Sequence, residues 1–184
     1  MVEDEKYYRQ FLAGDTSAYD QLLLRYGDSL VLYINASLHD FQESEDLMIE
    51  AFARIMVKKP KIKDGGFKAY LYKTARNLVI RYMSRTRKNQ FFSLDDMEDA
   101  LPADIRTEEH LMGEERKAVL HLCLDKISAE FREALWLVYM EGLSYAQAAL
   151  VMGVSRKKID NLVTRGKQAL RGELRKKGVT NAYE

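Results

Sequence analysis

Cationic and polar side chains near the C-terminus have the types and the spacing needed to contact DNA. Between Ser155 and Lys177, nine Lys or Arg residues are accompanied by only two acids. Apolar residues at helical spacing would bury one side of a helix here and leave the cations exposed beside amide and hydroxyl groups. Cations bind phosphate, while Asn, Thr and Arg can hydrogen-bond to base edges. The candidate DNA-binding residues of this helix are Arg156, Lys157, Asn161, Thr164, Arg165 and Lys167.

A shorter helix precedes the basic one and would complete a helix-turn-helix. Ser144 and Gln147 have the spacing of a capping box, so this helix should begin at Tyr145. Gly153 can end it with a positive φ, and Ser155 is the N-cap candidate of the basic helix. An ordinary helix pair with a solvated cationic face is the alternative, but cations mixed with Asn, Thr and Gln favour DNA binding. The apolar stripe expected on the shorter helix is Ala146, Ala149 and Leu150.

The formal net charge of +1 conceals blocks of opposite sign. From Lys58 to Lys88 there are eleven cations and one acid, Asp64, whereas residues 93–115 hold nine acids and one cation, Arg106. The two basic blocks can each bind phosphate. The acidic stretch between them would be repelled by phosphate unless it serves another surface.

Four amphipathic segments precede the acidic stretch. A short helix lies within residues 6–14, a long one follows a cap at Asp15 and runs to Leu38, and two more span about 44–58 and 67–87. The segment "KKPKIKDGG" separates the last two, because Pro and paired Gly residues break helices. The residues expected on the buried faces are Tyr7, Tyr8, Phe11, Leu12, Leu22, Leu23, Tyr26, Leu30, Tyr33, Ile34, Leu38, Leu47, Ala51, Phe52 and Ile55, with some of Leu71, Ala75, Leu78 and Tyr82.

These segments predict an all-α protein in which two small helical domains are joined by an acidic flexible linker. The N-terminal domain should cover residues 1–89 and the linker 90–113, where helical periodicity is weak. The C-terminal domain, 114–184, should contain a helix over 114–126, a helix capped by Ser128, and the helix-turn-helix.

Several classes of protein are excluded by the same reading. No stretch approaches the roughly 20 apolar residues of a membrane span, and the acidic N-terminus lacks a signal-peptide core, so we expect a soluble, cytoplasmic protein. Cys123 lies in an apolar run, which predicts a buried thiol. His39, His110 and His121 fall in unrelated contexts without metal-ligand or nucleophile motifs. We therefore expect no enzyme activity, no metal and no cofactor.

The order of motifs resembles a known family. The stretches "ESEDLMIEAFARI", "FKAYLYKTARN" and "ISAEFREALWLVYMEGLSYAQAALVMGVS" follow one another as in bacterial extracytoplasmic-function (ECF) RNA polymerase sigma factors, and the resemblance covers nearly the whole chain. It implies that the first stretch binds core RNA polymerase, the second opens promoter DNA, and the third binds duplex DNA. The chain would then be a cofactor-free transcription initiation factor with core polymerase and promoter DNA as partners. It leaves open whether an anti-sigma factor also binds.

The resemblance assigns roles to individual residues. The N-terminal domain would bind the unpaired strand of the minus-ten element, and the basic helix described above would read the minus-thirty-five element. Tyr70 and Tyr72 are two apart and cannot share a helix face, so at least one should be exposed; Tyr70 is favoured because it stands where the family carries Trp. The minus-ten candidates are Lys61, Lys63, Phe67, Lys68, Tyr70, Tyr72, Arg76 and Asn77. The candidate residues for binding core polymerase, at the clamp helices of its largest subunit, are Asp46, Glu50 and Arg54. The polymerase flap is the further partner expected from the resemblance.

The chain departs from the family pattern at working positions. It has Ile49 where the family has Gln, Arg81 where it has Asp, Ser128 where it has Pro, and Asp160 near the start of the recognition helix. Two other functions stay open. A free-standing helix-turn-helix regulator would use only the C-terminal domain. A polymerase-binding protein without promoter recognition would use only the polymerase contacts. DNA binding with and without core polymerase separates the three.

Overall fold

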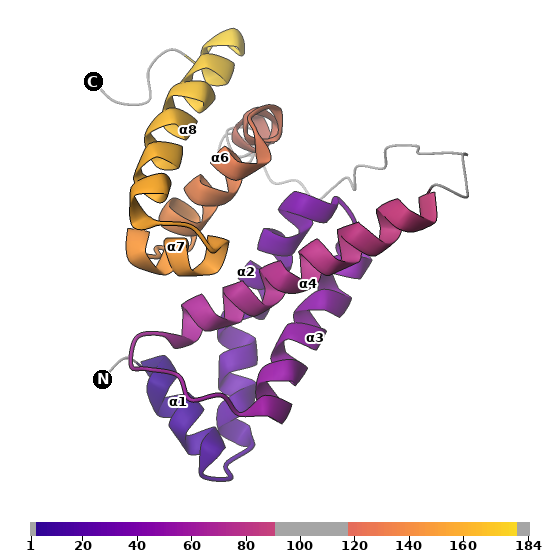
Figure 1. The fold of residues 1–184 in the computed structure, drawn as a ribbon, viewed down its shortest axis with the longest axis vertical. Coiled ribbons are helices and arrows are strands. Elements are labelled where there is room, and N and C mark those ends of the chain that lie inside the picture. The colour runs from indigo at the N-terminus through magenta and orange to yellow at the C-terminus, as the bar shows by residue number, and fades with distance from the viewer. Residues whose placement is uncertain (1–2, 91–117, 180–184) are drawn as a thin grey trace, which may run out of the picture.

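The computed structural model describes residues 3–90 and 118–179, and within those ranges the regular structure is entirely helical, as predicted (Figure 1). A helical stretch over 118–126 precedes the labelled helices of the C-terminal part. Most of the predicted linker lies outside the described residues. The labelled elements are α1 Glu3–Leu12, α2 Ser17–Leu38, α3 Phe41–Lys58, α4 Phe67–Gln90, α6 Ala129–Leu135, the π-helix η1 Trp136–Met140, α7 Tyr145–Met152 and α8 Arg156–Lys176.

Helices α1 to α4 form the N-terminal bundle around an aromatic core. The ring of Tyr8 on α1 lies 5.2 Å from that of Phe67 on α4, and Phe11 lies 4.7 Å from Tyr19 on α2. Tyr33 on α2 contacts the ring of Tyr72 on α4 at 5.1 Å. Aromatic pairs at these distances add to the free energy gained by burying apolar area. They fix α4 across α1 and α2, with its outer side turned toward the C-terminal helices (Figure 1).

The expected burial pattern of this bundle is largely confirmed, with differences at the helix starts and edges. Leu12 and Leu23 were expected inside but are 41% and 37% exposed, since each lies at the edge of its helix's apolar stripe. Helix α3 begins at Phe41, three residues before the predicted start, because Asp40 accepts a hydrogen bond from the Glu43 backbone amide and is the N-cap. Asp15 accepts from the Ser17 amide, although Thr16 is the N-cap residue of α2.

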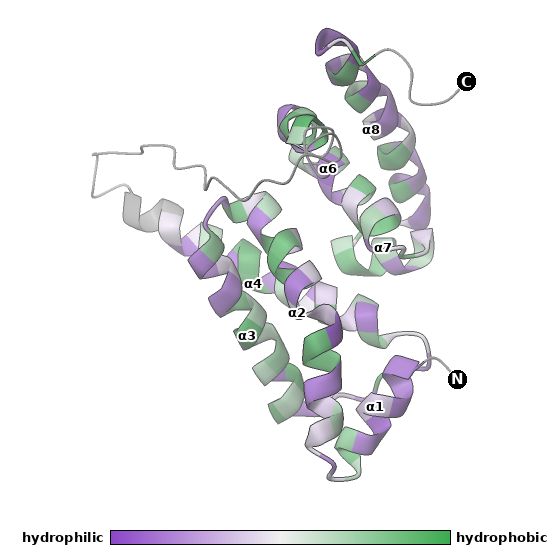
Figure 2. Cartoon of the chain, turned by 180° about the vertical axis from the view of Figure 1, so that it is seen from behind, coloured by the Kyte–Doolittle hydropathy of each residue, from purple (hydrophilic) through white to green (hydrophobic). Residues whose placement is uncertain are grey.

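The C-terminal bundle packs α6 and α7 against α8. The side of α8 turned away from α6 is hydrophilic in Figure 2, and Ile159, Leu162 and Val163 are its buried apolar residues. On α7 the predicted stripe is wrong at Ala146 and Leu150, which are exposed, because Ala148, Val151 and Met152 turn inward with Ala149. Cys123 is buried, as predicted.

The helix-turn-helix boundaries follow the predicted local signals. The Ser144 hydroxyl accepts from the Gln147 amide while the Gln147 side chain accepts from the Ser144 amide, so the capping box is complete. Gly153 has φ of 67° and ends α7. Ser155 caps α8 by accepting from the Lys158 amide.

The sequence did not predict the π-helix η1, which directly follows α6. The Glu141 amide donates to the Trp136 carbonyl five residues earlier, and the Trp136 indole donates to the Glu141 carboxylate at 3.1 Å. A π-helical turn inside an α-helix is rare and is often found at functional sites. Here it presents Glu141 toward α4. Within the described residues, no helix is long and apolar enough to cross a membrane.

Candidate nucleic-acid interface

Helix α8 exposes every residue that the sequence analysis assigned to duplex DNA. Arg156, Lys157, Asn161, Thr164, Arg165 and Lys167 are all exposed. Two of these cations are held over aromatic rings: Arg165 lies 5.6 Å from the Phe131 ring centroid and Lys167 lies 5.0 Å from that of Tyr139. Such contacts orient a cation without neutralising it, so both side chains keep their charge for a ligand.

Helix α4 carries the predicted single-strand residues, but it exposes only some of them. Asn77 is exposed, whereas Tyr70 is half-buried and packs against the core, so neither tyrosine is fully exposed, although Tyr70 is the more accessible of the two, as expected. Phe67 and Tyr72 are fully buried in the aromatic core, so the expectation that they offer stacking surfaces is wrong in this arrangement. Their rings face Tyr8 and Tyr33 instead of solvent.

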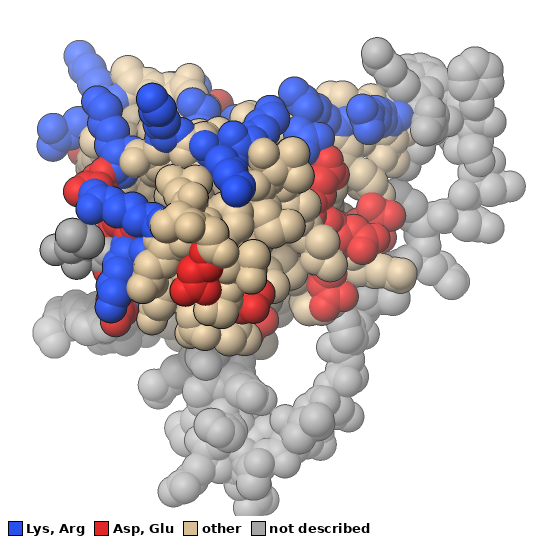
Figure 3. Space-filling view, turned by 90° about the horizontal axis from the view of Figure 1, so that it is seen from below, with Lys and Arg blue, Asp and Glu red and all other residues tan. Residues whose placement is uncertain are grey.

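The loop before α4 holds two more candidates, Lys61 and Lys63, and both are exposed. In the space-filling view, Lys and Arg side chains gather along one edge of the face, and Asp and Glu lie mostly apart from them (Figure 3). The acidic block of residues 93–115 lies outside the described residues.

Arg76, another predicted strand-binding residue, pairs with an acid of the C-terminal bundle. Its Nε donates to Glu133 Oε1 at 2.6 Å and a terminal nitrogen donates to Oε2 at 3.3 Å. Tyr33 donates to the same carboxylate at 2.8 Å, and burial together with the Glu133 charge raises the pKa of its hydroxyl. Burial alone would lower the pKa of Arg76, but Glu133 raises it overall. Glu133 therefore occupies Arg76 with the two-oxygen geometry that a phosphate would use.

A second acid of the C-terminal part, Glu141, also contacts α4, at Tyr72 and Lys68. It is 8% exposed and accepts from Tyr72 at 2.5 Å, and its carboxylate lies 3.1 Å from the Lys68 ammonium. Lys68 also donates to the Glu141 backbone carbonyl at 2.6 Å. Gln147 on α7 adds a hydrogen bond to the Gly65 carbonyl at 2.8 Å. Lys68 and Arg76 are thus both committed to the chain's own carboxylates.

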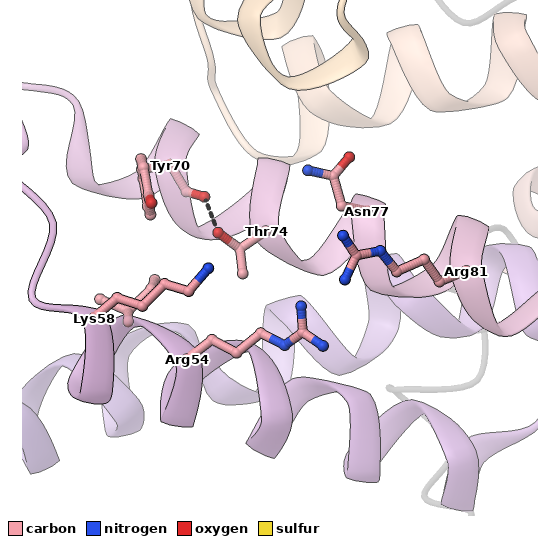
Figure 4. A pocket seen from close by; sticks show the side chains of 7 residues that line it. Arg54, Lys58, Tyr70, Thr74, Asn77 and Arg81 are labelled. Atoms are coloured by element: carbon pink, nitrogen blue, oxygen red, sulfur yellow. Dashed lines mark hydrogen bonds between the residues drawn. The ribbon is translucent and has the colours of Figure 1, made fainter.

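A cationic pocket of about 150 Å³ lies between α3 and α4, and the sequence analysis did not anticipate it. It is lined by Arg54, Ile55, Lys58, Tyr70, Thr74, Asn77 and Arg81. In Figure 4 the polar ends of Arg54, Lys58 and Arg81 point toward a shared space between the two helices, and the Asn77 amide lies above α4. Helical spacing could have found the Tyr70, Thr74, Asn77 and Arg81 face of α4, but not the cations that α3 adds to it.

Helix α3 also presents an outward surface that combines acids with apolar side chains. Asp46 is exposed and Glu50 partly so, as expected for a partner-binding face. Ile49, one of the departures from the family pattern, is 58% exposed beside them, and Val57 further along α3 is 80% exposed. Arg54, assigned to this surface, lines the α3–α4 pocket and is bonded to Glu50 at 2.6 Å.

The described residues contain no group of three or more His, Cys, Asp or Glu side chains able to hold a metal ion.

Comparisons with known proteins cover both bundles. The family Sigma-70 region 2 matches residues 19–89, and Sigma-70, region 4 matches residues 117–170. An ECF RNA polymerase sigma factor SigE of Mycolicibacterium smegmatis is 29% identical, over 89% of this chain and 65% of its own length. The RNA polymerase sigma-H factor of Pseudomonas aeruginosa is 27% identical, over 91% of this chain and 92% of its own.

Solved structures share the fold. CnrH, in a complex with the cytosolic domain of CnrY, aligns with a TM-score of 0.67 over 94% of this chain and 97% of its own, at 21% identity. The sigma factor RpoE of Bartonella quintana, solved with the anti-sigma factor NepR, aligns with a TM-score of 0.65 over 85% of this chain and 96% of its own, at 22% identity.

The two matched regions and the sigma factors among the relatives define a promoter-specific transcription initiation factor. Factors of this kind bind core RNA polymerase and direct it to promoters without being enzymes themselves. The chain belongs to the sigma-70 family, as an RNA polymerase sigma factor of the ECF type.

Proposed function

We propose that the N-terminal domain, residues 1–89, opens promoter DNA at the minus-ten element and that the C-terminal domain, 114–184, reads the minus-thirty-five element. The observation that carries this division is the contrast in side chains. Helix α4 places Tyr70 and Asn77 on an accessible face next to cations, which suits unpaired bases and their phosphates. Helix α8 exposes a continuous row of polar and cationic residues, which suits a major groove.

In the single-strand site, Tyr70 stacks on a base and Asn77 hydrogen-bonds to it. Lys61 and Lys63, on the exposed loop before α4, frame a flipped base and contact its phosphates. Lys68 and Arg76 join this site only after they leave Glu141 and Glu133. Strand opening is thus coupled to separation of the two bundles.

In the duplex site, Arg156, Lys157, Asn161, Thr164 and Arg165 reach base edges or the flanking phosphates. Lys167 lies further along α8 and contacts phosphate. These α8 residues are exposed in the packed arrangement of the two bundles, so the separation of the bundles is not needed to uncover them.

The polymerase site is the outward surface of α3. Asp46 and Glu50 pair with cations of the clamp helices in the largest subunit, and Ile49 supplies an apolar contact between them. The C-terminal bundle binds the flap. A factor that works on core polymerase and promoter DNA acts in the cytoplasm.

The packed arrangement is the resting form of the free protein. In this form Glu141 and Glu133 hold Lys68 and Arg76, the α4 cations that bind DNA. The free chain therefore binds promoter DNA weakly. Core polymerase spaces the bundles along the promoter and exchanges these internal ion pairs for phosphate contacts. An anti-sigma factor, the partner named for the Bartonella quintana protein of the same fold, would act by preventing this separation.

The test is promoter binding with and without core polymerase. Holoenzyme assembled from core polymerase and this chain should yield discrete start sites in run-off transcription of host genomic fragments, and the fragments should show protection of two elements about 20 base pairs or more apart. The chain alone should protect neither element at the same concentration. Specific nanomolar binding by the chain alone, unchanged by core polymerase, would instead identify a free-standing regulator.

A further inference from the structure

We propose that helix α1 positions the loop of residues 59–66 for base selection, through Tyr8 and Arg9. Its contacts hold Lys61 and Lys63 where a flipped base of the unpaired strand would enter. This inference rests on the proposed role of the two lysines in strand opening. It gives a part in promoter selectivity to a helix that lies outside both proposed DNA-binding surfaces.

The loop of residues 59–66 joins α3 to α4 without helical structure of its own and runs past α1 (Figure 1). Lys59 ends α3 in the left-handed region, with φ of 43°, and its ammonium lies 5.2 Å from the centroid of the Phe11 ring on α1. Gly65 turns the chain toward α4 with φ of 75°. A segment of this kind takes its position from the elements that contact it.

Tyr8 and Arg9 of α1 contact the loop on either side of its two lysines. The Tyr8 hydroxyl donates to the Pro60 carbonyl at 2.8 Å, and the Arg9 guanidinium donates to the Asp64 carboxylate. Tyr8 is buried, whereas the side chains of Arg9 and Asp64 are 51% and 68% exposed. The hydrogen bond of the buried tyrosine should therefore contribute more to the position of the loop than the exposed ion pair does.

Tyr8 also lies near the tyrosine that we propose stacks on a base. Burial, and to a smaller extent the charge of a neighbouring Tyr70, raises the pKa of Tyr8 to about 12. The hydroxyl of Tyr8 therefore keeps the proton that it donates to Pro60 at neutral pH. One residue of α1 thus holds the loop close to the proposed stacking surface.

Lys61 and Lys63 lie between the two points that α1 holds. Both lysines are exposed, whereas Ile62 between them is half-buried and packs against the core. Because Ile62 is turned toward the core, its two neighbours are turned outward. Pro60 and Asp64, which flank these three residues, are the partners of α1. The place of the two ammonium groups therefore depends on α1.

Helix α7 contacts the same loop, but only while the bundles are packed together. The Gln147 side chain donates to the Gly65 carbonyl at 2.8 Å, and it would leave with the C-terminal bundle. Tyr8 and Arg9 belong to the same bundle as the loop, so their contacts persist when the bundles separate. Helix α1 is therefore the element that holds the loop during strand opening.

The contacts with α1 should affect base selectivity more than affinity. A loop that moves freely still attracts phosphate through Lys61 and Lys63, because charge attraction requires little geometry. It no longer presents the two lysines at a fixed place beside one base, and selectivity between bases requires fixed contacts.

The experiment measures holoenzyme binding to fork-junction DNA whose minus-ten non-template strand is unpaired and carries each of the four bases in turn at each position. With the wild-type chain, one position should show the strongest preference. In the Tyr8→Phe/Arg9→Gln variant, the affinity ratio of the best to the worst base at that position should fall about tenfold. Preferences at the other positions, and binding to core polymerase, should stay as in the wild type.

A conservative variant and a mutant cycle separate positioning from general support of the bundle. Arg9→Lys keeps a cation opposite Asp64 and should retain most of the selectivity. Asp64→Asn should lose what Arg9→Gln loses, and combining the two changes should add nothing further, because they remove the same contact.

Glu3→Gln is the matched control. It breaks another surface ion pair of α1, with Arg25 on α2 at 2.8 Å, whose side chains are similarly exposed and do not belong to the loop. This variant should keep the wild-type base preferences. Thermal unfolding of all variants checks that the bundle stays intact, and Tyr8→Phe preserves the ring that packs on Phe67.

Three outcomes overturn the inference. An unchanged base ratio in the Tyr8→Phe/Arg9→Gln holoenzyme would exclude a role of α1 in selection. An equal loss at every position of the strand would mean that α1 supports the bundle and not the loop. Additive losses from Arg9→Gln and Asp64→Asn would show that the two side chains act separately. Failure of the proposed function is distinguishable, because the wild-type holoenzyme itself would then show no base preference on the unpaired strand.

Discussion

Helices α8 and α4, which we propose bind DNA, differ in whether their cations are engaged by the rest of the chain. Helix α8 is exposed along its polar face, and its cations contact aromatic rings that leave their charge available. Helix α4 has Lys68 and Arg76 bonded to Glu141 and Glu133 of the other bundle. Under the proposed function, the duplex-reading face of α8 is already exposed in the packed chain, whereas the strand-binding cations of α4 must first leave their internal partners. An order of events follows, in which duplex binding precedes melting.

The largest expected effect is on strand opening. Tyr70→Ala combined with Asn77→Ala should spare core binding and closed-complex formation but abolish permanganate-reactive thymines near the start site. Stacking of one base on an aromatic ring contributes roughly 1–3 kcal/mol, and the amide contact is lost as well. Phe41→Ala, which removes a 51% exposed aromatic ring at the start of α3, is the control and should open DNA normally. Wild-type reactivity in the double variant would remove both residues from the single-strand site.

The next largest effect, on single-strand binding, is expected when the ion pair between Arg76 and Glu133 is broken. Glu133→Gln leaves Arg76 without its charged partner, so the free chain should bind an unpaired oligonucleotide about tenfold more tightly, measured by fluorescence anisotropy. The expected gain in affinity is modest because both side chains of the ion pair are partly exposed to solvent, 25% for Arg76 and 20% for Glu133.

Glu130→Gln is the matched control for the broken pair. Like Glu133, Glu130 forms an ion pair, in this case with Lys158 at 3.0 Å. Both side chains of this pair are exposed, and both belong to the C-terminal bundle, so the pair does not involve α4. Equal affinities of the two variants for the oligonucleotide would show that Glu133 does not mask α4.

On α8 the changes should separate sequence reading from charge. Asn161→Ala or Arg165→Ala should relax preference at one or two base pairs of the upstream element, each contact being worth roughly 1–3 kcal/mol. Lys167→Ala should weaken all sequences alike and flatten the salt dependence. Binding of holoenzyme to a library of upstream elements distinguishes the two patterns. A uniform loss from all three changes would mean that α8 only positions the phosphate backbone.

The smallest effect concerns two glycines within α8. A Cβ at Gly172 meets nothing within 4 Å, so Gly172→Ala should raise the free energy of unfolding by up to about 1 kcal/mol through helix propensity. At Gly166 the Cβ would lie 3.3 Å from Leu135 and from the Cβ of Phe131 on α6. Gly166→Ala should therefore gain less or lose stability, as measured by thermal unfolding followed by circular dichroism. A larger gain at Gly166 than at Gly172 would contradict the close α6–α8 packing.

Sequence reasoning succeeded where the signal acts within one or two helical turns. The caps at Ser144 and Ser155, the end of α7 at Gly153 and the exposure of the α8 polar face depend on neighbours three or four residues away. The buried faces of α2 and α3 were predictable for the same reason. Leu12, Leu23, Ala146 and Leu150 were misplaced because periodicity gives the direction of an apolar stripe but not how far a neighbouring helix covers it.

The sequence by itself thus determined that the chain is helical, where most helices begin and end, and which residues of α8 face outward. Tertiary structure alone decided which cations are free. Glu133 and Glu141 are 57 and 69 residues from Arg76 and Tyr72, and nothing in their local sequence marks them as partners of α4. The burial of Phe67 and Tyr72, and the meeting of Arg54 with Arg81, likewise depend on how whole helices pack. Hydrogen bonds and charges act over a few ångströms of space, and only folding brings residues so distant along the chain within that range.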